Sequence, residues 1–472
     1  MNITSAFWLV LISFMVAVVA RRARVPYALA LVVTGLVIGV PRLLPQVHLN
    51  PHILFTLFLP PLLFESAINL RVAALRRNAV PIAIYALVGT VASAFIVGGL
   101  THWLLHIPLP VALVFGAIVS PTDPISVIAI FKRLDAGKRL TLLIEAESLF
   151  NDNTAFVLFT ILVGFALGGK ISVAAGLGQF ARLAVGGALV GGAIGVIASR
   201  VHYELDDHLA EITLTTIVAF GSYLCAESLH VSSVMAVITA GIVVGNYGAQ
   251  RAMSPSTQLA MTAFWEYAAF VVTSVVFLLI GIEVAYVHWA SQWRMALAAA
   301  VIVLIGRTVI YPLSLVVNVL KGHVPLAWQH ILVWGGLRGA LSMALALGLS
   351  GAFPYRETLV AATFGVVLFS LLVQGLTLGP LLKLLALTGF TKKESAGSAA
   401  QRRQIQRQIA DVRRAALIAE KSIWQESERR GWLQERKWQD AIARLDAELL
   451  ALETDMDDSA NDVNAVAPAD VP

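Results

Sequence analysis

Long runs of apolar residues, separated by short polar stretches, dominate the first 390 residues of the chain. An α-helix needs about 20 such residues to cross the apolar core of a bilayer, which is about 30 Å thick. The pattern predicts an all-α polytopic membrane protein of about thirteen spans. The predicted spans lie near residues 5–20, 25–40, 52–70, 79–100, 109–131, 140–168, 173–199, 209–226, 232–248, 262–287, 295–320, 327–350 and 357–388.

The composition favours a membrane protein and excludes several other classes. Of the 472 residues, 58% are hydrophobic and 13% are charged, whereas a soluble domain has roughly 25% charged residues. This excludes a water-soluble protein, a disordered chain and a nucleic-acid binder. Cys225 is the only cysteine, so an intrachain disulfide and a cysteine-rich metal site are also excluded. We expect no cofactor.

Basic residues in the predicted loops indicate the orientation of the chain. With the N-terminus outside, the inner loops hold thirteen Lys and Arg residues and the outer loops hold four, or five if Arg182 lies there. This asymmetry follows the positive-inside rule and places the C-terminus in the cytoplasm. Arg21, Arg22 and Arg24 follow the first apolar run, which is the wrong polarity for a secretory signal. We expect a multi-pass protein of the plasma membrane.

The residues after the last span differ in composition. Residues 391–446 are rich in Arg, Gln and Glu and have apolar residues at helical spacing, which predicts cytoplasmic helices. The basic part of these helices has two equally good interpretations. It contacts anionic lipid or a regulator, or it is simply a solvated surface. Residues 447–472 contain seven acids and no Lys or Arg, and we expect them to be disordered.

Ionisable side chains inside the predicted spans are costly in a bilayer, so each is a functional candidate. All ten histidines lie at or near span ends. The sequence has no His-Glu-x-x-His motif and no plausible buried Ser–His pair, which argues against an intramembrane protease and against an enzyme in general. The five intramembrane acids are Glu65, Asp123, Glu145, Glu147 and Asp152, and the two bases are Arg307 and Arg338.

The fifth predicted span is interrupted by Ser-Pro-Thr-Asp-Pro at residues 120–124. Two prolines remove two backbone donors and strain the helix. Inside a membrane such a break needs protein or water to satisfy the freed groups, and the freed carbonyls can coordinate a cation. The alternative is a kink that serves packing alone, but a kink does not require Thr122 and Asp123 between the prolines.

The sixth predicted span carries a second cluster of polar residues. Glu147 and Asn151 are four residues apart, as are Ser148 and Asp152, so each pair shares a helix face. At about 1.5 Å per residue, Asp152 lies roughly 18 Å from the start of the span. A carboxylate, a hydroxyl and an amide at that depth would form an oxygen-donor cation site. The alternative, a carboxylate paired permanently with an arginine, suits Glu147 better.

The twelfth predicted span contains three glycines within five residues, Gly335, Gly336 and Gly339. They weaken the helix and allow another backbone to approach closely. By the predicted topology the fifth and twelfth spans run in opposite directions. Two interrupted helices, one in each half of the chain, are typical of a transporter built from inverted repeats.

Four motifs together resemble the monovalent cation:proton antiporter-1 family, which includes the NhaP-type and NHE-type sodium/proton exchangers. The resemblance covers nearly all of residues 1–390, but not the tail. The motifs are Phe-Leu-Pro-Pro-Leu-Leu-Phe-Glu at 58–65, Pro-Thr-Asp-Pro at 121–124, Glu-Ser-Leu-Phe-Asn-Asp at 147–152 and Gly-Leu-Arg-Gly-Ala at 336–340.

The resemblance implies an NhaA/NhaP-like fold, a homodimer of thirteen-helix protomers, and Na⁺/H⁺ exchange in pH and sodium homeostasis. A moving core domain would comprise helices about 79–168 and 295–388. A dimer domain would comprise helices about 5–70 and 173–287. The two interrupted helices would cross within the core domain.

The resemblance also implies roles for individual residues. Asp152 would be the exchanging carboxylate and would bind Na⁺ transiently. Glu147 would form a structural ion pair with Arg307, and Arg338 would be a second buried arginine whose partner is not assigned. The residues expected to line or support the ion site are Asn151, Thr122, Ser148, Asp123 and Glu65.

Two residues depart from the family pattern. Asn153 stands where many relatives have alanine, and we expect its amide to lie next to the site and alter ion preference. Glu145 is an additional acid near the cytoplasmic mouth, and it lies either in an entry funnel or at the membrane interface.

The residues themselves favour a mechanism of competition. A carboxylate in a medium of low dielectric holds either a proton or a cation, because the bare charge is too costly there. The resemblance implies that a single carboxylate at Asp152 gives electroneutral exchange. Oxygen ligands suit K⁺ or Li⁺ as well as Na⁺, so the cation is not determined. The alternatives are a symporter of organic acids and sodium on a related fold, and a channel or a sensor governed by the tail.

Overall fold

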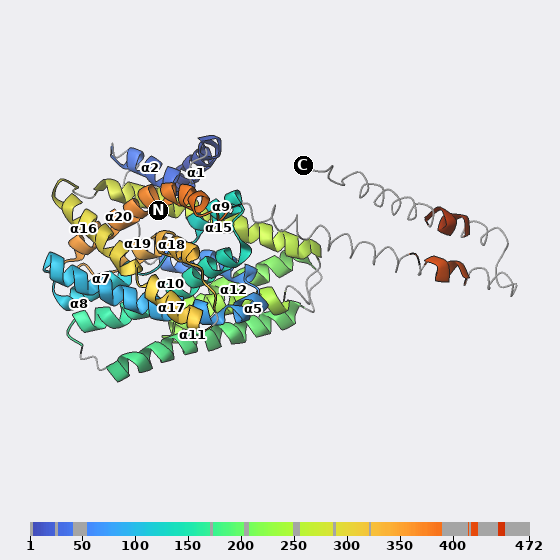
Figure 1. The fold of residues 1–472 in the computed structure, drawn as a ribbon, viewed down its shortest axis with the longest axis horizontal. Helices are drawn as coiled ribbons and strands as arrows, with labels where there is room; N and C mark the ends of the chain where they lie inside the picture. Colours follow the sequence, from blue (N-terminus) through green and yellow to red (C-terminus); the bar gives the residue numbers. More distant parts are fainter. Residues whose placement is uncertain are drawn as a thin grey trace, which may run out of the picture. The chain divides into compact units, whose positions relative to one another are not determined.

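The protein is described from a computed structural model (Figure 1). The chain divides into two compact units, Met1–Thr388 and Gly389–Pro472. The residues that the structure describes are 3–23, 27–40, 54–169, 173–202, 207–248, 255–286, 289–320, 322–388, 414, 417–422 and 442–448.

The first unit is helical throughout its described part, with helices joined by short turns. Its first half consists of α1 (Ile3–Ala23), α2 (Tyr27–Gly39), η1 (Leu54–Phe58), α4 (Leu59–Asn69), α5 (Val72–Arg77), α6 (Ala79–Ala83), η2 (Ile84–Gly89), α7 (Thr90–Leu105), α8 (Leu109–Ile118), α9 (Ile125–Leu134) and α10 (Lys138–Ala166). Its second half consists of α11 (Val173–Val201), α12 (His208–Ser228), α13 (Ser233–Val243), η4 (Val244–Gly248), α15 (Pro255–Tyr286), α16 (Trp289–Arg307), α17 (Ile310–Val319), α18 (Leu326–Trp334), α19 (Ala340–Leu347), α20 (Arg356–Phe369), η5 (Ser370–Gln374) and α21 (Gly375–Leu384).

Seven helical segments in the described part of the chain are long and apolar enough to cross a membrane, and all seven coincide with predicted spans. Shorter apolar helices occupy five of the other six predicted spans, among them α2 and α13, and the twelfth predicted span holds the short helices α18 and α19. The prediction of an all-helical polytopic membrane protein is therefore confirmed. The count of thirteen spans stays a prediction.

Two helices are interrupted at the positions that prolines and glycines predict. The fifth predicted span is divided between α8 and α9, which leaves residues 119–124 outside regular helix. The twelfth is divided between α18 and α19, with residues 335–339 unwound. A third break, between α16 and α17, was not predicted. It lies just before Pro312, whose ring excludes a regular helical bond to the carbonyl four residues earlier.

Small residues let neighbouring helices approach closely. A Cβ atom placed on Gly35 of α2 would lie 2.2 Å from the carbonyl oxygen of Leu278 in α15, and one on Gly281 would lie 2.2 Å from that of Val32. Such contacts are typical of helix packing in membranes, where lipid supplies no hydrophobic force between helices. Helix α7 packs in the same way along α8, and α10 packs against α8 (Figure 1).

The second unit belongs to the predicted cytoplasmic tail. Its described residues 417–422 and 442–448 are helical, and a helical tail over residues 391–446 stays a prediction. Lys421 Nζ lies 2.5 Å from Asp446 Oδ1. The predicted disordered segment lies outside the described residues from 449 onward, as do Arg24, Arg42 and Lys170 of the predicted loops.

Candidate functional site

The two interrupted helices meet through their unwound backbones. The amide of Asp123, between α8 and α9, donates a hydrogen bond of 2.7 Å to the carbonyl of Leu337, between α18 and α19. A Cβ atom on Gly339 would lie only 2.5 Å from the Cβ of Asp123. Position 339 therefore has no room for a side chain, and this glycine fixes how closely the two segments approach.

An arginine lies at the carboxyl end of α8. The Nη1 atom of Arg338 donates to the carbonyls of Ser120 at 2.5 Å and Pro121 at 3.0 Å. A cation stabilises the negative end of a helix and satisfies the carbonyls that the break has freed. The carbonyls of Ser120 and Pro121 are thus bound by Arg338 and are not free for a transported cation. They are the partners of Arg338 that the sequence did not reveal.

A second arginine lies at the carboxyl end of α18. Arg307 donates to the carbonyl of Leu332 through Nε and Nη2. Its Nη2 also lies 2.6 Å from Glu147 Oε1, and both side chains are buried. This is the ion pair that the resemblance implies. Gly336 makes room for it, because a Cβ there would lie 2.7 Å from Arg307 Nε.

Asp123 lies near the amino ends of the two second half-helices. Its Oδ1 accepts a hydrogen bond of 3.0 Å from the amide of Ile125, the first residue of α9. Its side chain also faces Gly339, the residue that precedes α19. A carboxylate stabilises the positive end of a helix. In each interrupted helix, therefore, an arginine lies at the carboxyl end of the first half. Asp123 lies near the amino end of the second half in both cases.

A buried cluster of neutral polar side chains ties α10 to the break between α8 and α9. The hydroxyls of Thr122 and Ser148 lie 2.8 Å apart. Asn151 Nδ2 donates to Thr122 Oγ1 at 2.7 Å, and the amide of Thr122 donates a weaker bond of 3.4 Å to Asn151 Oδ1. Three residues expected at the site are therefore brought together, and they hold the unwound segment against the helix that carries Asp152.

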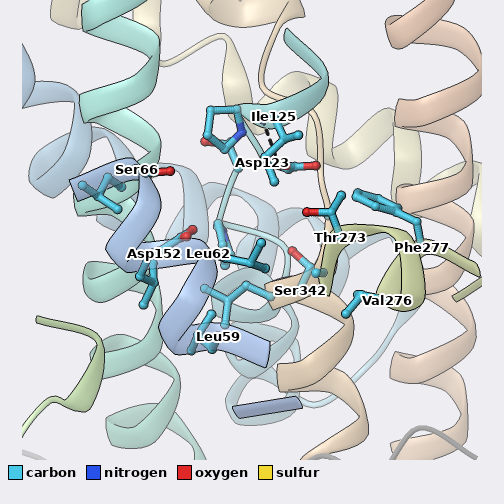
Figure 2. A pocket seen from close by; sticks show the side chains of 18 residues that line it. Leu59, Leu62, Ser66, Asp123, Ile125, Asp152, Thr273, Val276, Phe277 and Ser342 are labelled. Atoms are coloured by element: carbon cyan, nitrogen blue, oxygen red, sulfur yellow. Dashed lines mark hydrogen bonds between the residues drawn. The ribbon is translucent and has the colours of Figure 1, made fainter. Parts of the chain in front are cut away.

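Asp152 and Asp123 face a small cavity of about 60 Å³ beside this cluster (Figure 2). Figure 2 shows Asp152 and Ser66 on one side of the space and Thr273 and Ser342 on the other. Within the described part of the chain, Asp152 Oδ1, Asp123 Oδ2 and Ser342 Oγ are buried without a hydrogen-bond partner. None of the described residues that line the cavity is basic. Carboxylate and hydroxyl oxygens are the donors that hard cations prefer.

Three of these hydroxyl residues were not predicted from the sequence. Ser66 belongs to α4, Thr273 to α15 and Ser342 to α19, and all three line the cavity. The only feature of the sequence that could have indicated them is a hydroxyl residue within an otherwise apolar span. That signal is weak, because many such hydroxyls bond to the carbonyl four residues earlier, as Thr160 does to Phe156.

Glu65 does not line the cavity in this structure. Its Oε1 accepts a bond of 3.2 Å from Asn69, and its Oε2 accepts one of 3.4 Å from Ser66. Ser66, the next residue along α4, reaches the cavity instead. Glu145 lines a separate, wider cavity of about 940 Å³.

The structure does not place Asn153 beside the cavity that holds Asp152, where it was expected. Asn153 Oδ1 accepts a hydrogen bond of 2.5 Å from Ser232, the N-cap residue of α13, and its side chain is buried. Asn153 lines an apolar cavity between α10 and α11 and does not line the cavity that holds Asp152. Residues 152 and 153 are adjacent, and adjacent residues point about 100° apart around a helix, so they face different neighbours.

Comparison with known proteins identifies the family. The family model described as "Sodium/hydrogen exchanger, transmembrane" matches residues 9–384. The chain belongs to the sodium/hydrogen exchanger family. As a member of this transporter family it is not an enzyme.

Two curated relatives of the sodium/hydrogen exchanger family illustrate the match. The chain is 39% identical to the Na⁺/H⁺ antiporter NhaG of Bacillus atrophaeus over 402 residues, which cover 82% of this chain and 75% of the relative. It is 41% identical to the Na⁺/H⁺ antiporter ApNhaP of Aphanothece halophytica over 398 residues, which cover 84% and 74% of the two chains.

A solved sodium/hydrogen exchanger shares the fold. The sodium proton antiporter MjNhaP1 from Methanocaldococcus jannaschii at pH 8 aligns with a TM-score of 0.67 and 22% sequence identity. The alignment covers 81% of this chain and 98% of that chain. The exchanger fold therefore extends over most of this chain.

Proposed function

We propose that Asp152 is the side chain at which this Na⁺/H⁺ antiporter exchanges its two substrates. One observation carries the proposal: the carboxylate faces a small cavity, its Oδ1 is buried without a partner in the described part of the chain, and no described lining residue is basic. The side chain is therefore available to a cation in a way that Glu147, paired with Arg307, is not.

The chemistry follows from the cost of an isolated charge. A carboxylate removed from water is stable only when it is protonated or paired with a cation. Since the cavity offers Asp152 no internal cation, a proton and Na⁺ compete for it, and the release of one accompanies the binding of the other. Asp123, Thr273 and Ser342 would supply further oxygens to Na⁺, and Thr122, Ser148 and Asn151 would position Asp152.

Alternating access of this site would come from the movement of one group of helices against another. The cavity is lined by two groups of elements, α10 with both breaks and α4 with α15. The first group falls within the proposed core domain, helices about 79–168 and 295–388. The second falls within the proposed dimer domain, helices about 5–70 and 173–287. A displacement between the two would open the site to one side of the membrane at a time.

The exchange is proposed to be electroneutral, with one Na⁺ for one H⁺. Asp123 is a second carboxylate in the cavity, but its Oδ1 is engaged by the amide of Ile125 at the start of α9. We assign Asp123 to cation coordination and helix stabilisation, and Asp152 to the proton. The protein is further proposed to be a homodimer in the plasma membrane, with its N-terminus outside and its C-terminus in the cytoplasm.

The lining of the cavity favours a small cation over an organic acid. A site for an organic anion requires cationic groups or several donors, whereas this one presents two carboxylates. The guanidinium of Arg338 is directed to the carbonyls of Ser120 and Pro121. These features argue against the symporter alternative.

The test is proton movement in vesicles that contain the purified full chain. Asp152→Asn should abolish Na⁺-dependent proton release while the protein still inserts and keeps its thermal stability. Glu227→Gln, an acid-to-amide change at an exposed position of α12, is the matched control and should behave as the wild type. Appreciable exchange by Asp152→Asn would remove Asp152 from this role. Li⁺ and K⁺ in place of Na⁺ would establish the cation preference.

A further inference from the structure

The wide cavity of about 940 Å³ lies beside the first turn of α10, and most of the charged residues that line it are basic. A cation transporter gains nothing from positive charge at an entrance, because such charge repels its substrate. The positive-inside rule explains basic residues in these loops, but it does not require them to line one cavity. We call five of its lining residues the basic mouth: Arg71, Arg77, Lys132, Lys138 and Arg139. Two acids, Asp135 and Glu145, also line the cavity.

Two members of the basic mouth already have partners. Arg139 donates to Asn78 Oδ1 at 2.9 Å and to the carbonyl of His323 at 3.0 Å, bonds to the carbonyl of Gly322, and lies over the ring of Trp328. Its role is to join the start of α10 to the turn before α18. Lys132 interacts electrostatically with Glu65 and Glu145.

The other three members are available to a ligand. Among the residues that the structure describes, Arg71, Arg77 and Lys138 form no side-chain hydrogen bond and no ion pair. Arg71 and Arg77 lie at the two ends of α5, and Lys138 is the first residue of α10. Three cationic side chains therefore converge on one cavity from two separate parts of the chain.

The backbone adds to the same charge. Helix α10 has 29 residues, has no acidic residue in its first turn, and has no side-chain cap at Gly137. The amino end of such a helix carries unpaired amide donors and a partial positive charge. This end lies on the cavity, since Ala136, Lys138 and Thr141 line it as well.

We infer that the basic mouth binds a phosphate group, supplied either by the headgroup of an anionic phospholipid or by soluble phosphate. Arginine binds phosphate oxygens through two parallel N–H bonds, and lysine adds a compact charge. The two arginines come from the segment after α4 and the lysine from α10, so the ligand would bridge these two parts. The cavity is many times larger than one phosphate group, which leaves room for water or for the rest of a lipid headgroup.

The bound anion would change the transport of cations. This step rests on the proposed exchange at Asp152, whose cavity is lined by α4 and α10, the two helices from which the mouth extends. Without a ligand, the positive potential lowers the local Na⁺ concentration near Glu145. A bound phosphate neutralises part of that charge and lowers the potential, so the Na⁺ concentration for half-maximal exchange should fall about threefold at low ionic strength.

The first experiment measures binding and does not depend on transport. The full chain in neutral detergent is tested for binding of radiolabelled inorganic phosphate and for retention of phosphatidylglycerol, counted by native mass spectrometry. Arg71→Gln/Arg77→Gln/Lys138→Gln should weaken binding tenfold or more. Arg22→Gln/Arg182→Gln/Arg200→Gln removes as many exposed charges elsewhere and should bind as the wild type. Retention of the lipid alone identifies a headgroup site, and binding of phosphate as well identifies a site open to the soluble anion.

The inference is overturned if the wild type binds neither probe, if the mouth variant binds both as the wild type does, or if the control variant loses binding equally. Lys138→Gln alone, which leaves both ends of α5 intact, should give an intermediate loss if the triple variant does not fold. Asp152→Asn should bind the anion normally, which separates this inference from the proposed exchange. In phosphatidylcholine vesicles, added phosphatidylglycerol or phosphate should lower the half-saturating Na⁺ concentration of the wild type but not of the mouth variant.

Discussion

The amide of Asp123 and the carbonyl of Leu337 are joined by a hydrogen bond of 2.7 Å, although the two residues are far apart in the sequence. Through this bond the unwound segment between α8 and α9 is held against the one between α18 and α19. The proposed ion site adjoins this junction, because Asp123 contributes to both the bond and the cavity.

Gly339→Ala should disrupt the junction. The new methyl group would lie 2.5 Å from the Cβ of Asp123, so one backbone must move. Overpacking of this kind costs about 1–3 kcal/mol. We expect a lower melting temperature in detergent and a lower exchange rate in vesicles. Gly164→Ala in α10 is the control, since nothing lies within 4 Å of its added Cβ. Wild-type exchange and stability in Gly339→Ala would show that the junction is loosely packed.

Glu147→Gln should lower the stability of the protein and leave its affinity for Na⁺ almost unchanged. The change leaves Arg307 buried without its carboxylate partner, and breaking a buried pair costs about 3–5 kcal/mol. We expect a reduced yield of folded protein and a marked fall in melting temperature. The fraction that folds should keep a half-saturating Na⁺ concentration near that of the wild type. If Glu147→Gln were fully stable but unable to exchange, Glu147 would belong to the transport site.

Asp123→Asn should weaken cation binding without changing stoichiometry. An asparagine Oδ1 can still accept the bond from the Ile125 amide, so the start of α9 is preserved while the charge is lost. We expect the half-saturating Na⁺ concentration to rise about tenfold, which corresponds to about 1.4 kcal/mol. Exchange in vesicles should stay electroneutral, as shown by its insensitivity to valinomycin and K⁺. An abolished proton release would mean that Asp123, not Asp152 alone, carries the exchanged proton.

Asn153→Ala should alter the contact with α13 and leave ion preference unchanged. The substitution removes the acceptor of the Ser232 hydroxyl, a bond whose loss costs about 1 kcal/mol. The ratio of Na⁺ to Li⁺ exchange should equal that of the wild type, because Asn153 does not line the ion cavity. Ser232→Ala should lower the melting temperature further, because it also removes the N-cap bond from the Met235 amide, and the double variant should lose little more than Ser232→Ala alone. A changed ion ratio would indicate an indirect effect through α10.

The sequence predicted the breaks and the polar side chains that they carry. Two prolines three residues apart at 121 and 124, and three glycines within five residues at 335, 336 and 339, each weaken a helix strongly, so the two breaks could be located without a structure. The pairing of Glu147 with Arg307 was expected from the resemblance, and the structure contains it.

Other features of the site depend on the direction of side chains in three dimensions. Arg338 binds backbone carbonyls, which every residue has, so no sequence pattern could indicate its partner. Ser342 and Thr273 reach the cavity because of how α19 and α15 are rotated, and Asn153 turns to α13 for the same reason. Hydropathy locates a helix in the membrane but does not fix its rotation about its own axis.

The arrangement of charges around the breaks also bears on how membrane voltage acts on the protein. Arg307 is matched by Glu147, Arg338 by the carboxyl end of α8, and Asp123 by the amino end of α9. Moving one unbalanced elementary charge through 100 mV costs about 2.3 kcal/mol. Each of these fixed charges would move together with its counter-charge. A change between inward-facing and outward-facing states would therefore move little net charge across the membrane. The membrane potential would act mainly on the transported ions.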